Sequence, residues 1–159
     1  MSKRDVTKFN HLTGNNPSMG TEAEYWTQLK HQISRVYEEA KEMYEAAQEE
    51  DLNGVVDGWA DVMYTNEYVE DLLQAYGVNT KGVWQSVCDN NNTKFTQSYT
   101  YAAESKEALE EQGVDCYVEE VVFEGELWYC VKDTAENKVR KLKHHVSPSL
   151  EEFLPNHPL

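Results

Sequence analysis

The sequence predicts a mainly α-helical fold: a helical bundle followed by a small C-terminal β-hairpin or three-stranded sheet. Between residues 21 and 92, apolar side chains recur at alternating steps of three and four, the period of an amphipathic helix. Further along, two stretches rich in Val, Tyr, Phe and Trp flank the Glu-Gly-Glu of residues 124–126, which is a hairpin signal. We therefore expect a helical domain over residues 1–100 and a small α+β extension over residues 101–159.

The first long helix is expected to begin at Thr21, because Glu24 three residues later completes a capping box. An apolar stripe then continues to a break at residues 51–54. Its members are Trp26, Leu29, Ile33, Val36, Ala40, Met43 and Ala47. Such a stripe predicts a helix of roughly seven turns packed against other helices, as in a bundle. Ahead of it, apolar residues at positions 6, 9 and 12 predict a short helical turn that docks on the core.

Two further helices are expected after the break. The apolar face of the second consists of Val55, Trp59, Val62, Val69, Leu73 and Tyr76. Asn66 interrupts this face and is interpreted as a hydrogen-bonded core amide. Gly77 is expected to close the helix as a C-terminal cap. The apolar residues of the third helix are Val83, Trp84, Val87, Cys88 and Phe95.

The last third of the chain changes from helical to strand patterns. Residues 102–112 predict a short charged helix that ends at Gly113. Residues 115–123 and 127–131 are the two strands of the expected hairpin, and residues 138–143 supply a third strand if the sheet has one.

The charge balance excludes one large class of function. The formal net charge is −15, with 14 basic and 29 acidic residues. Nucleic-acid binding through a basic face is therefore not expected, because it needs clustered Lys and Arg. No apolar stretch is long enough to span a bilayer, so a membrane partner is not expected either. Three widely spaced cysteines and the absence of a secretory signal predict a cytoplasmic protein with reduced thiols.

Acidic side chains border the apolar stripe of the first helix. Glu42 lies three residues after Glu39 and four after Glu38, so its side chain neighbours both of them on the helix surface. Like charges at this spacing cost helix stability, and partial desolvation beside a packed seam raises that cost. A bound divalent cation would offset the repulsion.

The second helix repeats this arrangement with Asp57 and Asp61, four residues apart. Gly58 between them costs helix stability and indicates the close approach of another group. Two antiparallel helices that face each other with acidic pairs would form an oxygen-rich site of the kind magnesium prefers. The alternative is a solvated acidic face, which is the commoner role of such residues.

The third helix ends with Asn91 on its apolar face and Lys94 one turn further on. These side chains would suit a phosphate and a base or sugar edge. The alternative is a helix end that frays into the three asparagines of residues 90–92.

Taken together, these motifs resemble a known superfamily. They are the acidic run of residues 38–42, the Asp-Gly-Trp-Ala-Asp-Val-Met-Tyr of residues 57–64, and the segment from Val87 to Phe95. Their order resembles the all-α NTP pyrophosphohydrolases, a superfamily that includes MazG, the phosphoribosyl-ATP pyrophosphohydrolases and the dimeric dUTPases. The likeness is greatest to small phosphoribosyl-ATP-pyrophosphohydrolase-like proteins, many of them encoded by phages. For such a protein the compartment would be the host cytoplasm.

The resemblance implies roles for the acidic residues. Glu39, Glu42 and Asp61 would be ligands of magnesium, with manganese as a substitute. Glu38 would be a further ligand or the base that activates the attacking water. The superfamily often has Glu at the position of Gly58, so Asp57 would be the acidic partner on the second helix.

The resemblance also implies a substrate and an assembly. Asn91 and Lys94 would hold the substrate, and Asn90 occupies a position that is usually Ser. The expected reaction converts a nucleoside triphosphate, with a deoxynucleotide or a pyrimidine nucleotide somewhat favoured, to the monophosphate and pyrophosphate. The expected assembly is a homodimer or a dimer of dimers. Two alternatives stay open: a hydrolase of an alarmone or modified nucleotide, and a non-catalytic acidic interaction protein that mimics DNA.

Overall fold

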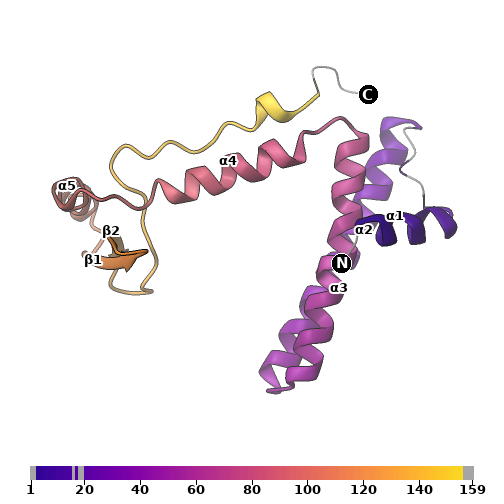
Figure 1. The fold of residues 1–159 in the computed structure, drawn as a ribbon, viewed down its shortest axis with the longest axis horizontal. Coiled ribbons are helices and arrows are strands. Elements are labelled where there is room, and N and C mark those ends of the chain that lie inside the picture. Colours follow the sequence, from indigo (N-terminus) through magenta and orange to yellow (C-terminus); the bar gives the residue numbers. More distant parts are fainter. Residues whose placement is uncertain (1–2, 16, 18–19, 156–159) are drawn as a thin grey trace. The chain divides into compact units, whose positions relative to one another are not determined.

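The computed structural model describes residues 3–15, 17 and 20–155. Contacts divide the chain into two compact units, one of Met1–Thr80 with Phe153–Leu159 and one of Lys81–Glu152. The predicted division into residues 1–100 and 101–159 stays a prediction. The elements are α1 (Lys3–Leu12), α2 (Glu22–Gln48), α3 (Leu52–Ala75), α4 (Thr80–Asn92), α5 (Tyr99–Glu110), β1 (Cys116–Phe123), β2 (Glu126–Asp133) and a short 3-10 helix, Glu151–Phe153 (Figure 1).

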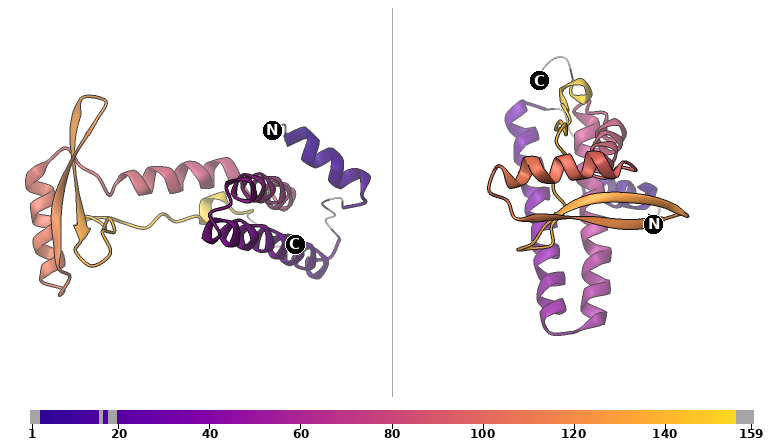
Figure 2. Two further views of the ribbon diagram at one scale, coloured as in Figure 1. Left: turned by 90° about the horizontal axis from the view of Figure 1, so that it is seen from below. Right: turned by 90° about the vertical axis from the view of Figure 1, so that its left-hand side faces the viewer.

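The first unit is built on the antiparallel pair α2 and α3, which lie side by side along much of their length (Figures 1 and 2). The predicted capping box at the start of α2 is confirmed. The Thr21 backbone N–H donates to Glu24 Oε2 at 2.7 Å, and the Glu24 N–H donates to Thr21 Oγ1 at 3.3 Å. These bonds satisfy backbone donors that have no partner within the helix.

A tight reversal joins α2 to α3. Glu50 adopts a left-handed conformation with φ of 58°, and the Asp51 N–H donates back to the Ala46 carbonyl at 2.9 Å. Asp51 then becomes the N-cap of α3, because its side chain accepts from the Asn53 N–H at 3.0 Å. One residue ends the first helix and the next begins the second, which fixes α2 and α3 antiparallel.

The core of the first unit is small. It consists of Val6, Tyr25, Leu29, Tyr68 and Leu72, with Tyr64, Val69 and Tyr76 packed against it. The predicted docking of the N-terminal helix is confirmed at Val6, whereas Phe9 and Leu12 remain exposed.

The predicted apolar stripes of α2 and α3 are only partly buried. Leu29 is inside, but Trp26 and Ile33 are 44% and 50% exposed, and Trp59 on α3 is 58% exposed. Asn66 is exposed as well, so its interpretation as a core amide is wrong. The physical reason is that a single helix pair buries one narrow seam, and the stripes are wider than that seam.

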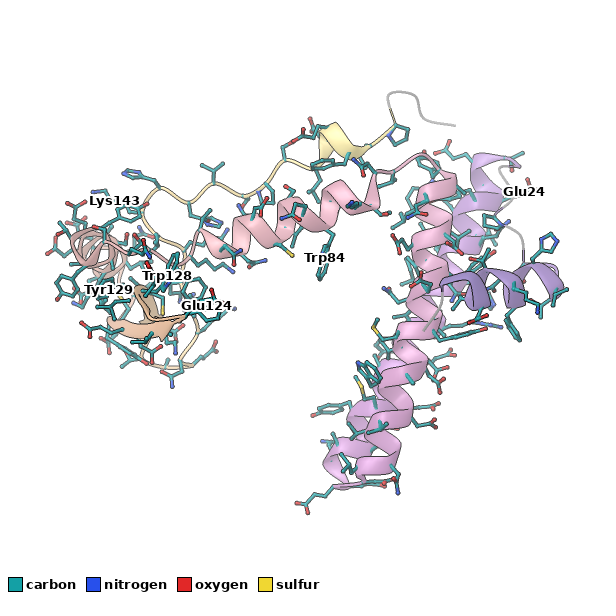
Figure 3. All side chains as sticks on the ribbon, viewed as in Figure 1. Glu24, Trp84, Glu124, Trp128, Tyr129 and Lys143 are labelled. Atoms are coloured by element: carbon teal, nitrogen blue, oxygen red, sulfur yellow. The ribbon has the colours of Figure 1, made fainter. Side chains whose placement is uncertain are left out.

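Two sequence predictions concern the end of α3 and the helix α4. The cap at Gly77 is confirmed: its φ is 98°, and the Val78 N–H donates to the Leu73 carbonyl at 3.0 Å. The predicted apolar face of the third helix is not a buried one. Among the described residues α4 has no buried side chain, and Trp84 points away from the helix with 69% of its surface exposed (Figure 3).

The second unit places α5 against a two-stranded antiparallel hairpin (Figure 2). Phe123 pairs with Glu126, so the turn is Glu124-Gly125, and both turn residues have positive φ, 52° and 82°. That is the geometry of a two-residue type I′ turn. The hairpin is thus confirmed. The third strand is not, because within the described residues the segment 138–143 forms only an isolated bridge between Val139 and Lys132.

None of the described helices combines the length and the apolar character that a membrane crossing requires.

Candidate active site

The acidic residues of α2 and α3 meet around Glu39. This side chain is partly buried, and burial raises the pKa of its carboxyl above the ordinary value of 4.5. Four further carboxylates raise the same pKa: Asp61, then Glu42, Glu38 and Asp57. A carboxyl that is disfavoured in its charged form by four others lies within the electrostatic reach of all of them. The four other acidic residues singled out in the sequence therefore lie near enough to Glu39 to act on its charge.

Gly58 sets the distance between the two helices at this point. It is buried, and a Cβ added to it would lie 2.7 Å from the Met43 Cβ and 2.9 Å from the Met43 Cα. Only a glycine fits there without moving α2. The predicted close approach is confirmed, and the approaching group is the backbone of the neighbouring helix, one residue after Glu42.

Among the described residues, none of the five carboxylates forms an ion pair with a lysine or arginine. The ion pair on α2 joins Lys41 to Glu45 at 3.5 Å and involves none of the five. Glu38 accepts a hydrogen bond from Ser34 Oγ at 3.5 Å. The donor set is oxygen only, which fits a hard divalent cation such as magnesium.

The carboxylates are gathered, but they are not arranged as a finished coordination shell. Within residues 3–15, 17 and 20–155, no three acidic, histidine or cysteine side chains converge closely enough to form a ready-made metal site. Glu38, Glu42, Asp57 and Asp61 are all exposed. Repulsion between like charges favours separated carboxylates when no cation is bound.

Asn91 and Lys94 lie in the second unit and contact each other. The Lys94 ammonium donates to Asn91 Oδ1 at 2.7 Å, and the Asn91 amide donates to the Val87 carbonyl at 2.9 Å. Asn90 binds the C-terminal segment instead, through the Val146 carbonyl at 2.5 Å. The grouping of Asn91 and Lys94 with the carboxylates of the first unit stays a prediction.

A polar cavity of about 160 Å³ on the first unit was not anticipated from the sequence. It is lined by Gly14, Asn15, Gln28, His31, Gln32, Arg35 and Tyr68. A usable signal was present, because His31 and Arg35 are four residues apart and Arg35 precedes Glu39 by four.

The antiparallel helices α2 and α3, with the five acidic residues, lie within the part of the chain that matches a known family. The model of one family, phosphoribosyl-ATP pyrophosphohydrolase, matches residues 6–91. Since this is more than half of the chain, the chain belongs to that family, within the MazG-like all-α NTP pyrophosphohydrolase superfamily. No curated protein and no solved structure matches the chain.

Family membership confirms the predicted resemblance and the class of chemistry. The protein is a pyrophosphohydrolase that acts on nucleotide-like substrates. The matched segment contains all five carboxylates and ends at Asn91. Helix α5, the hairpin and Lys94 lie beyond it.

Proposed function

We propose that this chain hydrolyses a nucleoside triphosphate, with a deoxynucleotide somewhat favoured, to the nucleoside monophosphate and pyrophosphate, and that it requires magnesium, or manganese in its place. The observation that carries the proposal is the position of Glu39 among four other carboxylates, none of which forms an ion pair with a lysine or arginine among the described residues. In a pyrophosphohydrolase, such a site has an evident use, because the phosphate chain needs a divalent cation to neutralise its charge.

Glu39, Glu42 and Asp61 would hold the metal. Glu39 is the partly buried member, so its position is the best fixed, and Glu42 lies three residues further along the same helix. Asp61 contributes the largest charge effect on the pKa of Glu39, which makes it the foremost partner from α3. Asp57 would be a fourth acidic ligand. When bound, the cation neutralises the phosphate oxygens during the reaction.

Glu38 would accept the proton of the attacking water. It borders the metal residues on α2 and is exposed, so water reaches it directly. The water oxygen forms a bond to the α-phosphorus while the bond from that phosphorus to the bridging oxygen breaks. The proton passes to the Glu38 carboxylate, and pyrophosphate leaves with the electron pair.

Asn91 and Lys94 would hold the nucleotide. In the free protein their polar groups bind each other at 2.7 Å. A substrate would replace that bond, so that the ammonium contacts a phosphate and the amide contacts a base or sugar edge.

The proposed assembly is a homodimer or a dimer of dimers. The side of the α2–α3 pair that lacks the carboxylates, here called the apolar face, exposes Trp26, Ile33, Tyr37 and Tyr44 on α2 and Val56, Trp59 and Met63 on α3. Positions 26, 33, 37 and 44 follow steps of seven, four and seven, which align on one line of a helix. Clustered exposed apolar side chains favour association, and a second copy of this pair is the partner we propose.

Product analysis tests the reaction. With magnesium, chromatography of any accepted triphosphate should give monophosphate and pyrophosphate as the primary products, and excess chelator should abolish turnover. A screen of the common nucleoside triphosphates and dUTP would identify the base and sugar. Diphosphate with inorganic phosphate, or equal turnover in chelator, would refute the proposal. An alarmone or modified-nucleotide hydrolase would show itself in the same screen by failing on every common triphosphate.

The non-catalytic DNA mimic is the less favoured candidate. A mimic needs carboxylates spread over its exposed surface, whereas here five of them gather around one partly buried position on two helices.

A further inference from the structure

The polar cavity of the first unit lies beside the acidic cluster. Arg35 precedes Glu39 by one turn of α2, and His31 precedes Arg35 by one more. Residues 31, 35, 39 and 42 therefore share one face of the helix. With a rise of about 1.5 Å per residue, Arg35 lies about 6 Å from Glu39 along the axis.

The walls of this cavity are fixed by bonds within the protein. Gln32 is buried, and its amide donates to the Thr65 carbonyl of α3 at 2.7 Å. The Tyr68 hydroxyl donates to the Asn15 carbonyl at 2.5 Å, and the Asn15 N–H donates to the Asn10 carbonyl at 2.8 Å. The cavity is thus preformed by α2, α3 and the segment after α1.

The charged or ring N–H donors of the cavity belong to Arg35 and His31. In the part of the chain that the structure describes, these two side chains form no hydrogen bond or ion pair with another residue. No acidic side chain lines the cavity. This is notable in a chain with 29 acidic and 14 basic residues, where an arginine has many carboxylates available as partners. A guanidinium that is left unpaired in a preformed polar cavity suits an anion with several oxygens.

We propose that this cavity binds the terminal phosphate of the triphosphate substrate, the phosphate at the far end of the leaving pyrophosphate. This inference rests on the proposed function, which puts the reacting phosphorus beside Glu38 and Glu39. A phosphate chain that continues along the same face of α2 reaches Arg35 within one helical turn. Arg35 then contacts the phosphate oxygens with its two-pronged guanidinium, and His31 supplies a further donor. The carboxylates would hold the cation, and the cavity would hold the anion that accompanies it.

This arrangement would favour triphosphates over diphosphates. A diphosphate that reacts at its α-phosphorus has no third phosphate to reach Arg35. Removing the guanidinium should therefore weaken the binding of the triphosphate much more than that of the diphosphate.

Three proteins test the site: wild type, Arg35→Met and the control Lys30→Met. Lys30 lies on the same helix but does not line the cavity, so Lys30→Met removes one positive charge from α2 outside the cavity. Calorimetry with inorganic pyrophosphate and magnesium should show binding weakened by about tenfold or more in Arg35→Met, the loss expected for a charge-assisted two-pronged contact. Lys30→Met should stay within about twofold, as for a screened surface charge. Circular dichroism checks that both variants are folded.

The second readout is the ratio of kcat/KM for a triphosphate to that for its diphosphate, which should fall by about tenfold in Arg35→Met and not in Lys30→Met. Unchanged pyrophosphate binding in Arg35→Met, no binding to wild type, or an unchanged ratio would each overturn the inference.

The two proposals fail separately. If no triphosphate is hydrolysed but pyrophosphate binding depends on Arg35, the proposed function falls and the phosphate site stands. If hydrolysis proceeds and Arg35→Met binds pyrophosphate like wild type, the phosphate site falls and the function stands.

Discussion

The charged form of Glu39 is disfavoured by its surroundings. Partial burial and four neighbouring carboxylates all act against its charged form. Pairs of like charges at helical spacing each cost about 0.2–0.5 kcal/mol on an isolated helix. The folded protein bears this cost in the absence of a cation, and a bound divalent ion would convert the same residues into a favourable site.

Glu39→Gln separates the catalytic role of the residue from its effect on stability. We expect turnover to be lost, because the amide is a poor magnesium ligand, and we expect the thermal midpoint in chelator to rise, because one repelling charge is gone. The matched control is Glu45→Gln on the same helix. Glu45 pairs with Lys41 at 3.5 Å, so its loss should leave activity intact and lower stability by at most about 1 kcal/mol. Full activity of Glu39→Gln would show that Glu39 is not a metal ligand.

The same residue gives a pH dependence of known sign. The folded-state pKa of Glu39 is raised above 4.5, so the native protein takes up this proton at a higher pH than the unfolded chain. The free energy of unfolding in chelator should therefore rise as the pH falls from about 7 to about 5. Urea unfolding of wild type and Glu39→Gln at several pH values measures this: the gap between them should be widest at neutral pH and narrow on acidification. A constant gap would contradict the raised pKa.

Acid eventually acts in the opposite direction through other groups. A hydrogen bond from the Thr21 backbone lowers the pKa of Glu24, a bond from the Lys143 ammonium lowers that of Glu104, and the Glu136 backbone N–H lowers that of Asp133. A lowered pKa contributes stability that is present above the ordinary pKa and lost below it. Measurements above about pH 5 therefore avoid these three carboxylates. Burial also lowers the pKa of His145, which opposes the effect of Glu39 in that range, and the comparison with Glu39→Gln removes this contribution because both proteins contain His145.

At the scale of elements, the contact between Gly58 and Met43 decides how closely α2 and α3 pack. In Gly58→Ala the new Cβ would overlap Met43 at 2.7 Å. Alanine favours the helix by about 1 kcal/mol, and overpacking costs about 1–3 kcal/mol, so the clash should dominate. Denaturation should show a lower midpoint, and magnesium affinity should fall because the acidic groups move apart.

The control for this experiment is Asn53→Ala, an exposed position on the same helix. It should stay within about 0.5 kcal/mol of wild type. If Gly58→Ala proved more stable than wild type, the close contact would not restrict the helices.

Local signals predicted the elements well. The capping box at Thr21, the cap at Gly77 and the turn at Glu124-Gly125 each depend on residues within a few positions of one another, and all three form. Periodicity was less informative about burial. It placed Trp59 and Trp84 on apolar faces but cannot say whether a neighbouring element covers them, and in the structure none does so fully.

The acidic site shows the same limit. Spacing on each helix identified Glu39 and Asp61 separately, the expectation of two antiparallel helices put them together, and the family resemblance assigned their roles. For the polar cavity, the spacing of His31 and Arg35 was a local signal of its donors. Its walls could not be predicted, because Gln32, Tyr68 and Asn15 are held by contacts between distant parts of the chain, at 2.5–2.7 Å, that no local pattern encodes.

For the whole molecule, the uncovered apolar face predicts self-association. Light scattering should find a particle of about twice the chain mass of 18.4 kDa, or about four times for a dimer of dimers. Trp59→Lys places a charge in this face and should shift the protein toward the monomer. Asn53→Lys adds the same charge to α3 outside the face and should not. A monomer at every concentration would contradict the assembly.

The proposed cation site and the proposed association surface lie on opposite sides of the α2–α3 pair, and the Gly58 contact lies between them. A ligand that changes the spacing of α2 and α3 at the cation site also shifts the residues of the association surface. Such coupling is thermodynamically reciprocal: if magnesium tightens self-association, self-association tightens magnesium binding by the same factor. Dilution of the protein would then weaken its hold on the metal, and activity per molecule would depend on protein concentration.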